Sequence, residues 1–270
     1  MKNLHKIETL HLKKLLNTRD LGGLPAEGGK TIRYEALIRS GKLYNLPQKT
    51  IDRLVKIGVT KVIDLRIDTE VGEYPDTPIP GSEYIHLPVL CTATVGITHE
   101  KNMMLTMMKE SERVKKEFGS VDKYMVAMYR SIFMQEEPQS RLAKFLRILV
   151  EEPGCVLWHC SAGKDRAGIC AMLIESLLGV EEQLIVLDYT LSDRFQRRKR
   201  IWQKLGMMIV PMPKFRALLF GMMNAKRRYM LSVMEMLKEE FGSIVEYCKQ
   251  KLSITDQDIA ILREKYLEKA

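Results

Sequence analysis

The segment that most constrains the fold is a short apolar run, Gly154 to His159, followed by a loop of small residues and a helical pattern. A run of this length and composition, bounded by turn residues, is typical of a strand buried inside a sheet. The residues after the loop have the spacing of an amphipathic helix, formed by Ile169, Met172, Leu173, Ser176 and Leu177. A strand, a tight loop and a helix in this order form a basic unit of parallel sheets that are covered by helices.

Two further runs have the composition of strands, Thr60–Leu65 and Tyr84–Val89, and Pro47–Ile57 before them has helical spacing. Two longer helical faces precede Gly154. They consist of Val121, Tyr124, Met125, Met128, Tyr129 and Ile132, and of Leu142, Phe145, Leu146 and Leu149. Strands that alternate with helices predict an α/β fold with a central, mainly parallel sheet flanked by helices, and the C-terminal half is rich in helical patterns.

Length and composition favour one folded domain. The chain has 270 residues, of which 46% are hydrophobic and 29% charged, as in ordinary globular proteins, so general disorder is excluded. No internal repeat or low-complexity linker interrupts it. We expect residues 1–270 to form a single domain with a helical insertion at about 92–135 and a helical C-terminal elaboration at about 195–270.

The cysteines and the apolar runs indicate the compartment. Five cysteines without a Cys-x-x-Cys pair fit neither a disulfide framework nor a zinc knuckle. No apolar run approaches the ~18 residues of a membrane span, and the basic N-terminus lacks the apolar stretch of a secretory signal. We therefore expect a reducing, cytoplasmic location, with export by another route left open.

The loop after His159 combines residues with a specific chemistry. Cys160 and Arg166 are separated by five residues, and the small ones among these let backbone N–H groups converge on one point. The next helix adds its positive N-terminus, and a guanidinium can grip two phosphate oxygens in parallel. The same field favours the thiolate form of Cys160. A thiolate facing a bound phosphate is a nucleophile suited to in-line attack on phosphorus.

This loop resembles the signature loop of the cysteine-dependent phosphatases. Its form His-Cys-x-Ala-Gly-Lys-Asp-Arg resembles in particular the atypical bacterial protein-tyrosine phosphatases that also act on phosphoinositides. Four more segments resemble that family in the same order: Asn17–Gly23, Ile38–Leu43, Val62–Arg66 and Asp188–Ser192. The resemblance implies a cysteine-phosphatase-like fold and a phosphorylated protein or phosphoinositide as substrate. We expect no metal or other cofactor, because Arg166 and the loop amides would carry the equatorial charge of the phosphoryl group.

The resemblance and the local chemistry assign roles to the loop. Cys160 is the expected nucleophile, and Arg166 is the expected catalytic cation. The expected phosphate-binding residues are Ser161, Ala162, Gly163, Lys164, Asp165 and Arg166. Lys164 would favour substrates with more than one phosphate, such as inositol lipids, or would simply face solvent. Behind the loop, Arg19, Asp20 and Arg66 are expected to form ion pairs, because a buried arginine needs a carboxylate partner.

The general acid is the least determined residue. Many related phosphatases carry an Asp on a separate loop after the second strand, but His86–Thr94 contains no carboxylate. Asp165 is the nearest candidate and a proposed donor in the resembled family, because nearby negative charge favours its protonated form. Asp64 and Asp68 are the fallback donors. The alternative role of Asp165 is to shape the loop through hydrogen bonds to the backbone.

One residue departs from the family pattern, which usually has Ser or Thr directly after the loop arginine. Here that residue is Ala167. A hydroxyl at this position stabilises the thiolate as it leaves the phosphoenzyme, so we expect slow breakdown of the phosphocysteine.

Three classes of function stay open at this point. The favoured one is a phosphatase that hydrolyses phosphotyrosine, with phosphoserine or phosphothreonine and phosphoinositides as further substrates. A weakly active phosphate-binding module and a sulfurtransferase are the alternatives.

Charge adds one expectation about partners. The net charge is +9, and basic residues cluster at Arg194, Arg197–Arg200 and Lys226–Arg228. These could contact an anionic membrane transiently or form a solvated helix face. Nucleic acid is not an expected partner, because the cluster lacks interleaved aromatic residues. The sequence leaves the oligomeric state undetermined.

Overall fold

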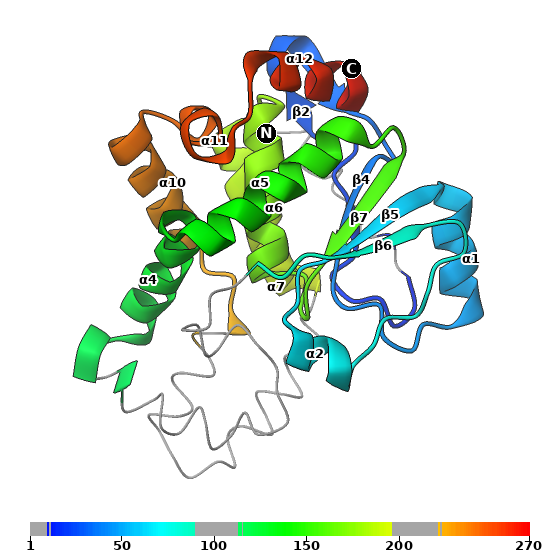
Figure 1. The fold of residues 1–270 in the computed structure, drawn as a ribbon, viewed down its shortest axis with the longest axis horizontal. Helices are drawn as coiled ribbons and strands as arrows, with labels where there is room; N and C mark the ends of the chain where they lie inside the picture. Colours follow the sequence, from blue (N-terminus) through cyan, green and yellow to red (C-terminus); the bar gives the residue numbers. More distant parts are fainter. Residues whose placement is uncertain (1–9, 11, 90–112, 115, 196–220, 222) are drawn as a thin grey trace.

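A computed structural model describes residues 10, 12–89, 113–114, 116–195, 221 and 223–270 (Figure 1). The strands are β1 Arg19–Asp20, β2 Pro25–Ala26, β3 Lys30–Ile32, β4 Leu37–Ser40, β5 Val59–Asp64, β6 Glu83–His86, β7 Cys155–His159 and β8 Leu267–Lys269. The helices are α1 Gln48–Ile57, α2 Asp68–Glu73, α4 Val121–Met134, α5 Glu136–Glu151, α6 Asp165–Leu177, α7 Glu182–Phe195, α10 Arg227–Phe241, α11 Ile244–Leu252 and α12 Asp256–Tyr266.

The main sheet is mostly parallel, as the sequence predicts. Its five strands lie in the order β1-β4-β7-β5-β6; only β1 pairs antiparallel. The register places His159 opposite both Ser40 and Asp64, and Asp64 opposite His86. The four parallel strands therefore end together, with the end of β7 between those of β4 and β5. Ligand sites of such sheets lie at this carboxyl edge.

Alternate residues of the central strand face two separate hydrophobic cores. Val156 and Trp158 belong to the larger core, which the helices on one face of the sheet complete, and Leu157 belongs to the smaller one. In β5, Ile63 and Val62 divide in the same way. A strand with apolar residues on both faces must be covered on both, which fixes β7 in the middle of the sheet.

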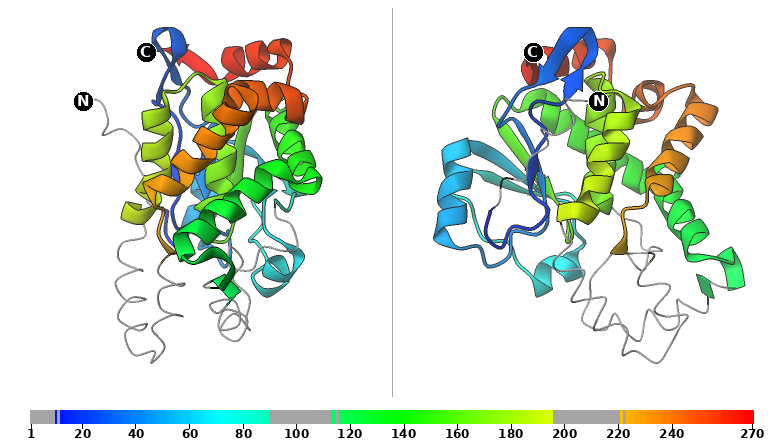
Figure 2. Two further views of the ribbon diagram at one scale, coloured as in Figure 1. Left: turned by 90° about the vertical axis from the view of Figure 1, so that its left-hand side faces the viewer. Right: turned by 180° about the vertical axis from the view of Figure 1, so that it is seen from behind.

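The helices cover the two faces unequally. α1 lies on one side of the sheet, and α5, α6 and α7 lie on the other, with α4 and α10 farther out (Figures 1 and 2). A second, antiparallel sheet of β2, β3 and β8 lies beside α12. Figures 1 and 2 show α12 at the top of the described part of the chain and α2 in its lower part. α2 follows β5, so it lies at the end where the parallel strands stop.

Most of the predicted elements are confirmed. The helical patterns correspond to α1, α4, α5 and α6, and two predicted strands correspond to β5 and β7. The third predicted strand is shorter than expected, since β6 ends at His86, before Pro88. The helical C-terminal half also contains β8, which was not predicted. The division into an insertion and an elaboration stays a prediction, because residues 90–112 and 196–220 lie outside the described residues.

The basic cluster is only partly within the described residues. Arg197–Arg200 lie outside them. Lys226 Nζ is 2.6 Å from an oxygen of Asp122, and Arg228 also pairs with that carboxylate. These two basic side chains therefore have a partner within the chain, and contact with a membrane stays a prediction. Of the helices described here, none combines the length and the apolar composition needed to cross a bilayer.

Candidate active site

Cys160 leaves β7 at the carboxyl edge of the sheet, between the ends of β4 and β5. It is a free cysteine and only 1% exposed, so the sulfur lies beneath the surface of the loop. The loop then turns directly into α6, which begins at Asp165. The predicted order of strand, loop and helix is therefore present, and the positive N-terminus of α6 adjoins the loop.

Gly163 lets the loop lie close to the neighbouring strand. Its φ is +65°, a conformation that residues with a side chain rarely adopt. A Cβ atom built there would lie 2.5 Å from the carbonyl of Ser40 and 2.6 Å from the amide nitrogen of Gly41. Any side chain at position 163 would thus push the loop away from the end of β4.

Asn17 and Arg39 hold the loop in place by donating hydrogen bonds to its backbone carbonyl groups. Asn17 Nδ2 donates to the carbonyl oxygens of Ala162 and Gly163, at 3.0 and 2.7 Å. Arg39 Nη2 donates to those of Gly163 and Lys164, both at 3.1 Å. These carbonyls are fixed on the outer side of the loop. A loop held in this way can present its N–H groups inward, as an anion site requires.

These supporting residues are tied together by Asp188 of α7. Arg19 Nε is 2.5 Å from Asp188, and Arg39 Nη1 also pairs with that carboxylate. Arg19 further donates to Asn17 Oδ1 at 2.6 Å. Burial would raise the pKa of Asp188, but the two arginines lower it. Three segments that the sequence places far apart, at 17–23, 38–43 and 188–192, thus meet behind the loop.

The pairing expected behind the site is correct for Arg19 and Arg66 and wrong for Asp20. Asp20 accepts from the backbone amides of Gly22 and Glu35, at 2.9 and 2.6 Å, and has no arginine partner among the described residues. Burial raises the pKa of this carboxyl. Its role is to hold the turn between β1 and the segment before β4, which is a local backbone need that a motif comparison does not reveal.

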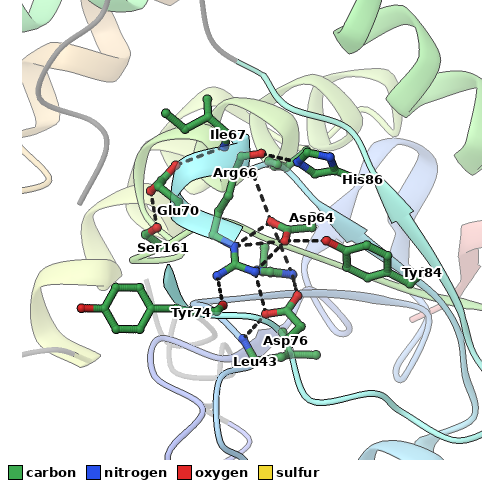
Figure 3. A network of polar contacts seen from close by, with 12 residues as sticks. Leu43, Asp64, Arg66, Ile67, Glu70, Tyr74, Asp76, Tyr84, His86 and Ser161 are labelled. Atoms are coloured by element: carbon green, nitrogen blue, oxygen red, sulfur yellow. Dashed lines mark hydrogen bonds and ion pairs between the residues drawn. The ribbon is translucent and has the colours of Figure 1, made fainter. Parts of the chain in front are cut away.

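Arg66 occupies the centre of a second polar network (Figure 3). Its guanidinium lies between Asp64 and Asp76, at 2.6 and 2.8 Å, and Tyr84 donates to Asp64 at 2.9 Å. His159 Nε2 is 2.7 Å from Asp76. Asp64, Asp76 and His159 form a group that could hold a metal, but Arg66 already supplies a cation to both carboxylates. His159, the residue directly before the cysteine, lies against this network through its contact with Asp76.

The loop arginine is held by a residue that the sequence analysis missed. Arg166 Nη1 and Nη2 bond the two oxygens of Glu70 in α2, at 2.6 and 2.9 Å, and Ser161 Oγ donates to the same carboxylate. Burial would lower the pKa of Arg166, but Glu70 raises it, and the charge of Cys160 acts in the same direction. Arg166 therefore stays charged although it is fully buried.

Glu70 responds to the same pairing. Burial would raise the pKa of its carboxyl, but Arg166 and the hydroxyl of Ser161 lower it to about 2. One oxygen also accepts from the amide of Ile67 at 3.2 Å. The sequence did contain a signal for Glu70. It is an acidic residue shortly after β5, and the end of β5 lies beside the end of β7, from which the loop begins.

The two polar residues before Arg166 are both buried. Lys164 is 2% exposed, so the alternative that it faces solvent is wrong. Its Nζ lies 3.3 Å from Asp165 Oδ1 and 3.4 Å from the carbonyl oxygen of Asn224. Asp165 Oδ1 also accepts from the hydroxyl of Tyr129 in α4. Within the described residues the Asp165 carboxylate bonds no backbone group, which does not support the alternative that it only shapes the loop.

The structure argues against both fallback donors. Asp64 is fully buried and bonded by Arg66 and Tyr84. Burial would raise its pKa, but His159 and Arg66 lower it to about 2, so it carries no proton at neutral pH. The side chain of Asp68 is 94% exposed, and its carboxylate lies 3.6 Å from His86 Nδ1.

Ala167 is fully buried and brings no hydroxyl to the loop. Its carbonyl oxygen accepts from Trp158 Nε1 at 3.0 Å, which ties the first turn of α6 to the central strand. The loop does contain one hydroxyl, that of Ser161, but it donates to Glu70. The departure that the sequence shows at position 167 is therefore not compensated by Ser161.

Comparisons with known proteins show the family to which the chain belongs. The model of the family described as "Tyrosine phosphatase family" matches residues 10–268. A Cupriavidus necator protein that carries the name of a tyrosine-protein phosphatase is 27% identical over 253 residues, which cover 93% of this chain and 85% of the relative. The triple specificity protein phosphatase PtpB of Mycobacterium tuberculosis is 26% identical over 254 residues, covering 86% of this chain and 90% of the relative.

A solved structure with a weak match is that of P. aeruginosa TpbA in complex with phosphotyrosine. It is 14% identical and covers 72% of this chain and 90% of that one, with a TM-score of 0.29, too low to compare the folds. The family match spans nearly the whole chain and disfavours both the sulfurtransferase and the binding-module alternatives. The protein belongs to the tyrosine phosphatase family and is a cysteine-dependent protein-tyrosine phosphatase.

Proposed function

We propose that this chain hydrolyses phosphotyrosine in two steps, with Cys160 as the nucleophile. The Cys160 thiolate attacks phosphorus in line with the phenolic oxygen, so that an S–P bond forms as the P–O bond breaks. Asp165 gives its proton to the departing oxygen, which leaves as the neutral tyrosine hydroxyl. Arg166 and the loop amides bind the three equatorial oxygens of the transferring group.

The second step returns the enzyme to its starting state. Asp165, now a carboxylate, removes a proton from a water molecule that attacks the phosphocysteine. The new P–O bond forms as the S–P bond breaks, and the electron pair returns to sulfur as the Cys160 thiolate. Inorganic phosphate is released with the oxygen of that water, and Asp165 is protonated again for the next turnover.

The observation that carries this proposal is the rigid support of the loop on both sides. Glu70 fixes the guanidinium of Arg166 with two bonds, and Asn17 and Arg39 fix the loop carbonyls. Electrostatic stabilisation is strongest where charged groups and dipoles are held in place before the reaction, because no energy is then spent on reorienting them. A structural cysteine in a core would need none of these contacts.

Phosphoinositides are a second candidate substrate, favoured by Lys164. This second cation of the loop is buried beside Asp165 rather than extended into solvent. A buried ammonium group beside the phosphate-binding loop favours a ligand that carries a second negative charge near its reacting phosphate. A relative bears the name of a triple specificity phosphatase, which supports including phosphoserine and phosphothreonine as well.

A substrate panel tests the proposal. Phosphate release is measured from peptides with phosphotyrosine, phosphoserine or phosphothreonine, and from phosphoinositide vesicles. We expect turnover of the phosphotyrosine peptide and its loss, by at least ~10³-fold, in Cys160→Ser, because a serine hydroxyl is not ionised at neutral pH. Undiminished phosphate release from Cys160→Ser would contradict the mechanism. Faster turnover of vesicles than of peptides would make the lipid the preferred substrate.

We also propose that the protein works in a reducing compartment such as the cytoplasm. The described cysteines Cys155, Cys160, Cys170 and Cys248 are free, and a thiolate nucleophile must remain reduced. Cell fractionation tests this location. Recovery of the protein mainly outside the cytoplasm would contradict it.

A further inference from the structure

Asp165 is held by a pair of buried tyrosines from two other helices. The hydroxyl of Tyr129 in α4 bonds Asp165 Oδ1, and the hydroxyl of Tyr189 in α7 lies 2.8 Å from that of Tyr129. Tyr129 is fully buried and Tyr189 is 1% exposed. A polar chain therefore runs from the helical layer to the first residue of α6.

Both hydroxyls keep their protons at neutral pH. Burial raises the pKa of Tyr129 well above that of an ordinary tyrosine, and the charge of Asp165 acts in the same direction. Burial likewise raises the pKa of Tyr189. When Tyr129 donates its single proton to Asp165, the hydrogen bond between the tyrosines requires Tyr189 to donate to Tyr129.

The packing leaves Tyr129 little freedom to move. Its ring stands edge-on to those of Tyr189 and Tyr229, at 6.4 and 6.1 Å between centroids. Tyr229 bonds Asp122 instead and does not extend the chain toward Asp165. Buried aromatic rings in such edge contacts are held in one orientation, so the hydroxyl of Tyr129 is a fixed point.

The contacts of Asp165 distinguish its two oxygens. The hydroxyl of Tyr129 and the ammonium of Lys164 both approach Oδ1, and no contact among the described residues uses Oδ2. An Asp near the N-terminus of a helix can turn toward the free amides of the first turn. Here the bond to Tyr129 holds the carboxyl in another direction, with Oδ2 left to exchange a proton.

We infer that Tyr129, supported by Tyr189, is a positioning residue that fixes Asp165 through Oδ1 so that Oδ2 transfers the proton to the leaving group. This inference rests on the proposed function, since it assumes that Asp165 is the general acid. Tyr129 does not touch the substrate, and its effect appears only in steps that need proton transfer.

The test compares two substrates that differ in their need for an acid. A phosphotyrosine peptide has a leaving group with a pKa of ~10 and needs a proton, whereas an activated dinitrophenyl phosphate does not. We expect Tyr129→Phe to lower kcat/KM on the peptide by about 10- to 100-fold and to change kcat/KM on the activated ester by less than about threefold, because kcat/KM reports the formation of the phosphocysteine and not its breakdown. Tyr189→Phe removes only the hydroxyl that supports Tyr129. We expect it to slow the peptide reaction selectively as well, but by a smaller factor than Tyr129→Phe.

A matched control and a double mutant complete the test. Tyr247→Phe removes a buried hydroxyl that bonds the carbonyl oxygen of Phe133, also in α4, and leaves both rates unchanged. Tyr129→Phe adds nothing further to Asp165→Asn if the two residues act as one unit. Equal losses on both substrates, or additive losses in the double mutant, would overturn the inference.

The outcomes also separate this inference from the proposed function. If Asp165→Asn slows both substrates equally, Asp165 is not the acid and the inference fails, while Cys160 remains the nucleophile. If Cys160→Ser retains turnover, the proposed function itself fails. Thermal unfolding of each variant shows whether a loss of rate reflects a loss of folded protein.

Discussion

The carboxylate of Glu70 bonds both terminal nitrogens of Arg166, at 2.6 and 2.9 Å, and both residues are almost fully buried. Removing one member of a buried ion pair is costly, because the other charge is left without compensation. The pair also fixes the plane of the guanidinium. Arg166 can therefore be aligned before the substrate binds. The conformational entropy of its side chain is lost when the protein folds and not during catalysis.

Glu70→Gln should impair catalysis without removing a residue that reacts. We expect kcat/KM to fall by about 10²-fold, since the amide carries no charge and can accept only one of the two bonds from Arg166. Steady-state kinetics with a phosphotyrosine peptide measure this. Glu83→Gln is the control, because Glu83 is an exposed partner of Lys61 on β5. A Glu70→Gln enzyme as active as the Glu83→Gln enzyme would show that the guanidinium needs no support.

Acid should destabilise the protein through the same carboxyl. The pKa of Glu70 is about 2 in the folded state and near 4.5 in the unfolded chain. The folded state then binds fewer protons between these values, so the stability is complete above about pH 4.5 and is lost as the pH falls toward 2. The shift corresponds to about 3 kcal/mol. Asp64, with a pKa of about 2, adds to the loss in the same range.

Urea unfolding between pH 6 and pH 2.5 measures this dependence. The free energy of unfolding of Glu70→Gln should start lower at pH 6 and decrease less steeply, because the amide does not titrate. The two curves should approach each other as the pH falls. Parallel curves for the wild type and the variant would contradict the assignment of the low pKa to Glu70.

Arg39→Lys should weaken the binding of phosphate. A lysine keeps the charge near Asp188 but cannot donate in one plane to two loop carbonyls and a carboxylate. We expect the inhibition constant for inorganic phosphate to rise by about tenfold, as one to two hydrogen bonds of the loop are lost. Arg33→Lys is the matched control, since Arg33 bonds carbonyls of Leu267 and Glu264 beside the small sheet. Equal inhibition constants in both variants would show that Arg39 does not shape the loop.

Ala167 should make breakdown of the phosphocysteine slow. We expect a burst of phenol release followed by a slower steady state, because no hydroxyl stabilises the leaving thiolate. Ala167→Ser should speed the steady state by about tenfold and reduce the burst, if the new hydroxyl donates one hydrogen bond to sulfur. Stopped-flow measurements with an aryl phosphate follow both phases. A linear time course of the wild type from the first turnover would contradict this prediction.

The sequence predicts the framework because its signals are local. The continuous apolar run Gly154–His159 identifies a central strand, and the spacing from Cys160 to Arg166 identifies the loop. β4 and β1 were not predicted as strands. They are only four and two residues long, too short to show a period of their own.

The parts of the site that were missed depend on tertiary contacts. Glu70 and Arg166 are 96 positions apart, and Tyr129 is 36 positions from Asp165. Tyr129 was predicted as one more apolar residue of a helical face, since periodicity records burial and not hydrogen bonding. The signal for Glu70 lay in the topology, because an acidic residue just after β5 must lie near the end of β7 once both strands are parallel neighbours.

The most direct test of the account is to trap the covalent intermediate. The enzyme is mixed with an activated aryl phosphate, quenched in acid within one turnover, digested and examined by mass spectrometry. We predict a phosphoryl group on Cys160 in the wild type and no modified peptide in Cys160→Ser. A phosphoryl group on another residue, or rapid turnover without any modified peptide, would contradict the central role of this cysteine.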